Sequence, residues 1–153
     1  MRTLFYLLII VFIINLFSAC QGKKSQDLKY YPNGSVMRKT NLIDHKKEGE
    51  MIEYYNDGKV KSICLFENDL QTGRCIYYFQ SGAIQEIQYY ESDKQQSGDT
   101  IFYENGRYQL IMNFKDGIKH GAVQKYDTIG KMYFHAKYNM DTLIEVNGVP
   151  LAK

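Results

Sequence analysis

The stretch Tyr54-Tyr55-Asn56-Asp57-Gly58 returns 24 residues later as Tyr78-Phe79-Gln80-Ser81-Gly82, and again as Phe102-Tyr103-Glu104-Asn105-Gly106. Related phrases end at glycines in the same register upstream and downstream, Gly34 and Gly130. A second series of glycines lies between these phrases, at Gly49, Gly73, Gly98 and Gly121. Self-similarity at a fixed period of this length predicts a repeat architecture.

Each 24-residue unit contains two strand-like runs and two turns, which is the pattern of a β-hairpin. In the unit that begins at Gly58, residues 59–66 and 74–79 are rich in β-branched and aromatic side chains, and a polar segment separates them. Apolar and polar side chains alternate with period two, which is clearest at Tyr108, Leu110, Met112 and Phe114. We therefore expect an all-β fold, an elongated single antiparallel sheet of about five β-hairpin repeats that is apolar on one face.

Turn chemistry supports the same fold. Dipeptides such as Asn33-Gly34, Asp57-Gly58 and Asn105-Gly106 supply positive φ angles, and we expect them to form tight hairpin turns. The unit after Gly82 departs from the spacing, because one residue is added before Gly98. A bulge or a longer turn is expected there.

The first 20 residues form a segment that is distinct from the repeats. Arg2 precedes an apolar run from Leu4 to Phe17 that ends in Ser18-Ala19-Cys20. The run has the length of an export signal rather than of a membrane span, so we expect a helical signal peptide. Small residues before a cysteine resemble the lipobox of bacterial lipoproteins, which implies cleavage before Cys20 and its lipidation, with palmitate among the acyl chains. An uncleaved signal anchor is the alternative.

These observations divide the chain into four segments. They are a signal peptide at residues 1–19, a lipidated cysteine and flexible tether at 20–27, repeats at 28–138 and a C-terminal cap at 139–153. The lipobox resemblance implies attachment to a membrane through Cys20 in a bacterial cell envelope. In bacterial lipoproteins, an aspartate directly after the lipidated cysteine resembles a signal for retention in the inner membrane, and an acidic cluster is associated with export to the cell surface. Neither follows Cys20, so the resemblance favours the outer membrane, facing the periplasm.

The charge balance gives no support to a nucleic-acid partner. The whole chain carries 19 Lys and Arg against 17 Asp and Glu. Cleavage before Cys20 removes Arg2 alone, which leaves a balance of +1. Nucleic-acid binding needs a clustered basic face, so we expect no nucleic acid among the partners.

A family resemblance rests on two phrases. Phe114-Lys115-Asp116-Gly117-Ile118-Lys119-His120-Gly121, followed by Tyr126, and Phe66-Glu67-Asn68-Asp69, followed by Gly73 and Tyr77-Tyr78, resemble the variant MORN repeat of the YwqK-like antitoxin family. The resemblance runs from about Leu28 to Tyr138. It implies a non-catalytic protein that binds another protein, with a toxin as one candidate partner.

Tyrosine and phenylalanine at equivalent positions of successive units predict a ladder across the sheet that presents a binding face. The chain has 14 Tyr, 8 Phe and no Trp. The candidate binding residues are Tyr31, Tyr54, Tyr55, Tyr77, Tyr78, Phe102, Tyr103 and Tyr126. A partner protein is the leading hypothesis. The alternative is a structural envelope protein whose aromatic face contacts membrane lipid or cell-wall glycan.

No motif in the sequence supports catalysis, a metal or a cofactor. The histidines His45, His120 and His135 are not part of any sequence pattern typical of a nucleophile or of metal ligands, so we expect no enzyme, no metal and no cofactor.

Cys64 and Cys75 are candidates for a disulfide, because an exported protein meets an oxidising compartment. For the turn near Asp69-Leu70 we expect a register with Cys64 opposite Gly73 and Cys75 as a diagonal neighbour, too far for a bridge unless a bulge shifts the register.

Overall fold

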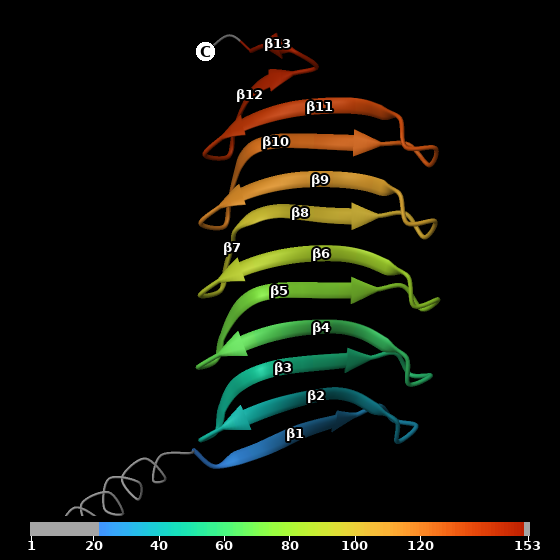
Figure 1. Cartoon of the computed structure of the whole chain (residues 1–153), viewed down its shortest axis with the longest axis vertical. Coiled ribbons are helices and arrows are strands. Elements are labelled where there is room, and N and C mark those ends of the chain that lie inside the picture. The colour runs from blue at the N-terminus through green and yellow to red at the C-terminus, as the bar shows by residue number, and fades with distance from the viewer. Residues whose placement is uncertain (1–21, 152–153) are drawn as a thin grey trace, which may run out of the picture.

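The computed structural model describes residues 22–151. The predicted signal peptide and the predicted lipidation site Cys20 lie outside these residues. Within them the chain forms one antiparallel sheet in a single layer, in which the strands follow one another in chain order (Figure 1). The predicted all-β fold of hairpin repeats is confirmed. No helix in this part of the chain is long and apolar enough to cross a membrane.

The sheet has 13 strands. Twelve of them pair edge to edge in sequence, and β7 pairs with β6 beside this path. Their bounds are β1 Lys24–Tyr30, β2 Val36–Ile43, β3 Lys46–Tyr54, β4 Val60–Glu67, β5 Leu70–Tyr78, β6 Ile84–Glu91, β7 Lys94–Gln95, β8 Ser97–Phe102, β9 Tyr108–Lys115, β10 Ile118–Tyr126, β11 Met132–Asn139, β12 Thr142–Val146 and β13 Val149–Pro150. β1 begins at Lys24, so a strand occupies the last four residues of the segment predicted as a tether.

The two edges of the sheet carry different turns (Figure 1). Five-residue loops follow β1, β3, β5, β8 and β10, and in each the first residue is bonded to the fifth, as between Tyr55 N and Lys59 O at 2.8 Å. Tight two-residue turns occupy the other edge, where both central residues have positive φ, as at Asn68 and Asp69. The prediction that Asn33-Gly34, Asp57-Gly58 and Asn105-Gly106 form tight turns is therefore wrong, whereas the same prediction for Asp116-Gly117 and Asn147-Gly148 is confirmed. In the five-residue loops only the glycine takes positive φ.

Aspartates in the tight turns bind each repeat to the one before it. Asp69 N donates to Lys47 O at 3.1 Å, and the Asp69 carboxylate accepts from Lys47 N at 2.8 Å. The same reciprocal pair recurs one repeat later, where Asp93 bonds the backbone of Gln71 in both directions. Asp44 and Asp141 repeat it near the two ends. Because the bonds join residues 21 or 22 positions apart, they fix the spacing of neighbouring repeats along one edge.

Tyrosine hydroxyls bind the repeats at the opposite edge. Tyr31 donates to Tyr54 O at 2.7 Å, Tyr55 to Tyr78 O at 2.6 Å and Tyr103 to Tyr126 O at 2.9 Å. Phe79 occupies the corresponding place between Tyr55 and Tyr103 and has no hydroxyl to donate. These second aromatics of the repeated phrase therefore join neighbouring loops within the protein itself.

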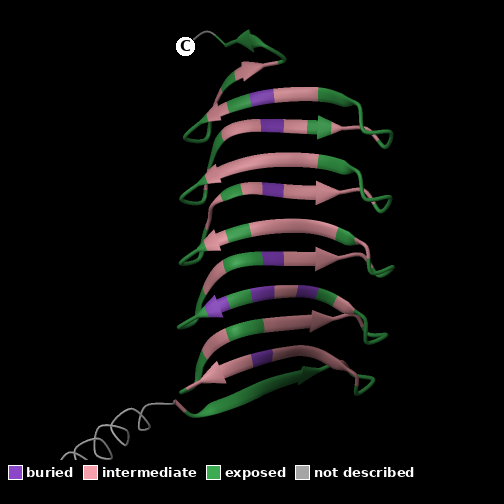
Figure 2. Cartoon of the chain, in the orientation of Figure 1, coloured by how far each residue is buried: buried purple, intermediate pink, exposed green. Residues whose placement is uncertain are grey.

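Every buried residue of the described chain lies on one face of this sheet. Ser62, Cys64 and Phe66 alternate along β4, and Cys75 pairs directly with Cys64. Cross-strand pairing places the other buried residues on the same face of the sheet. They are Thr40, Asp99, Val123 and Ala136. We call this the inner face. The buried positions follow one another from strand to strand near mid-strand (Figure 2).

A shift of register beside the second glycine series brings the cysteines together. The tight turn centres on Asn68-Asp69, and a bulge in β5 at residues 73 and 74 moves the partner of Cys64 from Gly73 to Cys75. The expectation that Cys75 is a diagonal neighbour is therefore wrong, and the alternative of a bulge that brings the two cysteines opposite each other is confirmed. The structure joins Cys64 to Cys75 as a disulfide, and the Cys75 side chain is fully buried. In the irregular unit Ser97, rather than Gly98, takes positive φ, in agreement with the added residue.

The tyrosine links predict opposite effects of two reciprocal substitutions. Tyr55→Phe removes a hydroxyl bond between repeats and should lower the free energy of unfolding by about 1 kcal/mol. Phe79→Tyr supplies the missing hydroxyl opposite Phe102 O and should raise it by a similar amount. Urea titration followed by circular dichroism measures both. Equal midpoints for the two variants and the parent chain would contradict a linking role for these hydroxyls.

The disulfide makes a second prediction. It closes a loop with a sequence separation of 11 residues, and a loop of this size stabilises the fold by about 3 kcal/mol in the chain-entropy model. Replacing both cysteines by alanine should therefore lower the urea midpoint while the sheet still folds. Alkylation of the unfolded chain without reductant should leave Cys64 and Cys75 unlabelled, and labelling of both would show that the bridge is absent.

Candidate interaction surface

The face opposite the buried residues carries a ladder of isoleucines. Ile52, Ile63, Ile76 and Ile87 are successive partners in the register of β3 to β6. Thr100 and Ile111 continue the row across β8 and β9. We call this the outer face. All five isoleucines are half-buried against one another, although the described chain places no second layer over them (Figure 1).

A row of larger apolar side chains runs beside the isoleucines on the outer face. Tyr54, Tyr78, Phe102 and Tyr126 lie two residues after Ile52, Ile76, Thr100 and Gln124 of the same strands, so they share their face. The partner residues Val60, Ile84, Tyr108 and Met132 lie between them in the register. The Phe102 and Tyr108 rings are 5.4 Å apart, and those of Tyr108 and Tyr126 are 6.1 Å apart.

The partner residues are the more open part of this row, because Tyr54, Tyr78, Phe102 and Tyr126 are half-buried. Tyr108 is 50% exposed and Met132 is 46% exposed. Leu65 and Tyr89 add exposed apolar surface on the far side of the isoleucine ladder. Contiguous apolar strips on a protein surface are typical of interaction sites. The outer face is thus the candidate interaction surface.

The eight predicted binding residues divide into three groups. Tyr54, Tyr78, Phe102 and Tyr126 lie on the outer face. Tyr31, Tyr55 and Tyr103 lie in the loops, where their hydroxyls bond the next repeat. Tyr77 lies on the inner face, because it pairs with Ser62. Periodicity selected two adjacent aromatics in most units, but it could not separate the aromatic that faces outward from the aromatic that lies in the loop.

The inner face has a different character, because acidic and polar side chains gather beside the disulfide. Asp99 is 4% exposed, accepts a bond from Gln95 through Oδ2 at 3.3 Å, and leaves Oδ1 buried without a partner. Glu86 of β6 accepts from Gln88. Burial raises the pKa of Asp99, and burial together with the neighbouring Asp99 charge raises the pKa of Glu86.

Two tyrosines extend this inner cluster. Tyr90 donates to Gln88 Oε1 at 2.9 Å. Burial, followed by the nearby negative charges, raises the pKa values of both Tyr77 and Tyr90, so both keep their protons at neutral pH. No group of three or more His, Cys, Asp or Glu within residues 22–151 has the geometry to hold a metal ion. The cluster is a buried polar network that fixes the middle of the sheet.

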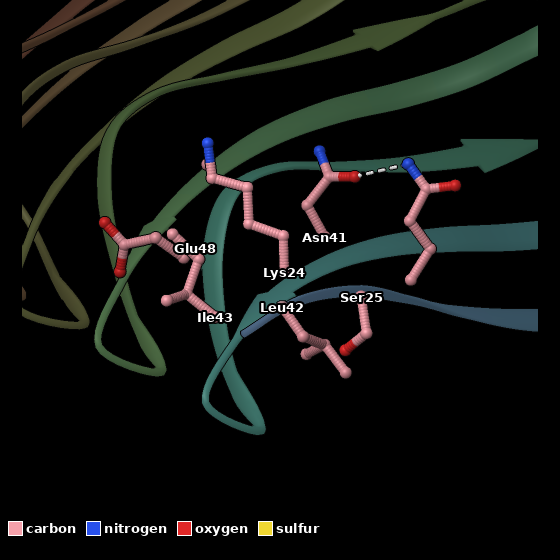
Figure 3. A pocket seen from close by; sticks show the side chains of 8 residues that line it. Lys24, Ser25, Asn41, Leu42, Ile43 and Glu48 are labelled. Atoms are coloured by element: carbon pink, nitrogen blue, oxygen red, sulfur yellow. Dashed lines mark hydrogen bonds between the residues drawn. The ribbon is translucent and has the colours of Figure 1, made fainter. Parts of the chain in front are cut away.

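A depression lies at the tight-turn edge of β1 to β3 (Figure 3). Lys24, Asn41, Ile43 and Glu48 point to one side of the sheet there, while Ser25 and Leu42 point to the other. Three of its polar side chains are already bonded, because Gln26 donates to Asn41 at 2.9 Å and Glu48 accepts from Asn68 N at 2.9 Å. It is open and shallow, and it lacks converging free polar groups of the kind that orient a small ligand.

The comparison with known families agrees with this geometry. Residues 47–68 match the model of a family described as the MORN repeat variant. The matched segment covers nearly all of β3, the loop that contains Tyr55, and the whole of β4. No curated protein matches the chain. The other units show the same order of strand, loop, strand and tight turn, so the chain is a repeat protein that contains a MORN-type unit.

The carboxyl pair predicts an unusual dependence of stability on pH. Because folding raises the pKa values of Glu86 and Asp99, the folded state binds more protons than the unfolded state above the ordinary values of 4.5 and 3.8. The free energy of unfolding should therefore fall as the pH rises from about 4 toward the raised values. Urea midpoints measured in steps between pH 4 and 8 test this.

Glu86→Gln and Asp99→Asn should each raise the midpoint at pH 7 and flatten the slope, since the amide resembles the protonated acid. Glu91→Gln on the same strand as Glu86 is the control, because Glu91 is exposed. A slope unchanged in both inner-face variants would show that these carboxyls ionise freely.

Proposed function

We propose that this chain is a non-catalytic repeat protein, lipid-anchored in a bacterial envelope, that binds a partner protein through its outer face. The observation that carries the proposal is the uncovered row formed by Tyr54, Tyr78, Phe102 and Tyr126 beside the isoleucine ladder. A strip of this kind offers rigid aromatic anchors on a preformed surface, and such anchors contribute most of the binding energy in protein interfaces.

The lipid anchor fits this arrangement. The lipobox-like Ser18-Ala19-Cys20 precedes β1 by only a few residues. Lipidation at Cys20 would therefore hold the first repeat close to the bilayer. The partner would then meet a face whose length is set by the number of repeats.

The YwqK-like resemblance supplies a finer version of the proposal, in which the partner is a toxin and the protein masks it. The outer face suits masking, because it can cover an elongated surface without an enclosed pocket. Membrane lipid and cell-wall glycan are the competing occupants, since tyrosine also lies at bilayer interfaces and stacks on sugar rings.

A capture experiment tests the outer face. The full chain is reconstituted in detergent and mixed with envelope extract, liposomes or purified peptidoglycan in parallel. The test variant carries Tyr78→Ala and Tyr108→Ala on the outer face. The control variant removes two aromatics from the inner-face side of β11, Phe134→Ala and Tyr138→Ala. We expect one protein to bind the parent and the control, and its recovery to fall at least tenfold with the test variant.

Equal recovery by all three chains would contradict binding through the outer face. Strong retention on liposomes or peptidoglycan that is lost with the test variant would instead assign this face to lipid or glycan. Circular dichroism of each variant confirms that its sheet content is intact before the comparison is made.

A further inference from the structure

The first strand leaves one long edge of the sheet unpaired. All seven residues of β1, from Lys24 to Tyr30, are exposed, and within residues 22–151 β1 pairs with β2 alone. The far end is protected differently, because the last strand β13 has two residues and one of them is Pro150. Short strands and proline block edge pairing, whereas a long regular strand invites it.

The direction of the backbone groups along this edge follows from the loop bonds. Lys23 O accepts from Asp44 N, and Tyr31 N donates to Ser35 O, so residues 23 and 31 point toward β2. Backbone direction alternates along a strand, and the N–H and C=O groups of Lys24, Gln26, Leu28 and Tyr30 therefore point away from the sheet. An incoming strand must form its hydrogen bonds to these four residues.

The side chains of β1 determine which incoming strand fits this edge. In an antiparallel pairing of two β1 strands centred on Leu28, Gln26 forms a hydrogen-bonded pair with Tyr30 of the second copy. Asp27 stands opposite Lys29 of the second copy, twice by symmetry. These charged pairs fall at non-hydrogen-bonded positions, where opposing side chains approach most closely.

Two neighbouring registers of the β1–β1 pairing have less favourable charge pairs. A pairing centred on Asp27 sets two aspartates against each other, and one centred on Gln26 sets Lys23 against Lys29. Like charges directly opposite are destabilising. Charge complementarity thus favours the register centred on Leu28 over these two neighbours, and a self-complementary edge closes as a two-fold dimer instead of growing into a filament.

We propose that two copies of this chain associate through antiparallel pairing of β1 with β1, centred on Leu28, to form one continuous sheet. The pairing joins the outer faces of the two copies into a single strip, since Leu28 lies in the same row as Ile52. The interface is small, so the association is concentration-dependent. It involves none of the residues assigned to partner binding.

Charge exchange at one pair of positions tests this dimer. Asp27→Lys places Lys opposite Lys twice, and Lys29→Asp places Asp opposite Asp twice. Each should weaken association by roughly tenfold or more. The double variant D27K/K29D restores opposite charges across the interface and should recover the parent association. Sedimentation equilibrium of the full chain in density-matched detergent, over a range of concentrations, gives the association constant of each variant.

A parent chain that stays monomeric at every concentration would overturn the proposal. So would a dimer whose association constant is the same in all four chains, or a double variant as weak as the single ones. Lys61→Asp on β4 is the matched control, since Lys61 is exposed on an interior strand, and it should leave association unchanged. Capture of a partner by the outer face is measured separately, so either result can fail alone.

Discussion

A sheet one layer thick must bury its side chains against neighbours in the same layer. This constraint explains why all the buried residues of the described chain lie on one face and most of them near mid-strand, with Cys64 and Cys75 at the centre. A row of this kind is too thin to act as a large hydrophobic core. The fold therefore depends on cross-strand bonding and on links that recur with the repeat, as expected of a quasi-one-dimensional array. The tyrosine hydroxyls secure one edge, and the turn aspartates secure the other.

The same constraint separates the residues that hold the sheet together from those that are available for binding. The aromatics of the loops are used to join repeats, and the inner face is filled by the disulfide and the polar network. The outer face keeps a long strip of isoleucines and aromatics that nothing in the described chain covers. Its side chains contribute to the sheet through contact with one another, while their exposed surfaces stay available. Binding through this face is consequently compatible with a rigid, preformed protein.

The sequence predicted the repeat, the strands and the antiparallel sheet, because period-two patterning and glycine spacing are local signals. It did not predict the register around Cys64, since this depends on a bulge at Gly73 and Arg74 that only the paired strand defines. The aspartate links were also missed. Asp69, Asp93 and Asp141 are spaced by multiples of 24 residues, and this spacing can be read from the sequence. The backbone bonds that they form could not be inferred from it, because these bonds depend on each tight turn lying beside the preceding repeat. The carboxyl pair of Glu86 and Asp99 joins two strands across the irregular unit, where periodic reasoning is weakest.

Small-angle X-ray scattering of residues 22–151 tests the single-layer sheet most directly. Twelve strands spaced by about 4.8 Å, each about 30 Å long, form a thin slab with a radius of gyration of roughly 18 Å. Pairing of two copies can only increase this value. A compact globule of the same length has a radius of gyration of roughly 14 Å. The account predicts about 18 Å or more, and a value near 14 Å would contradict it.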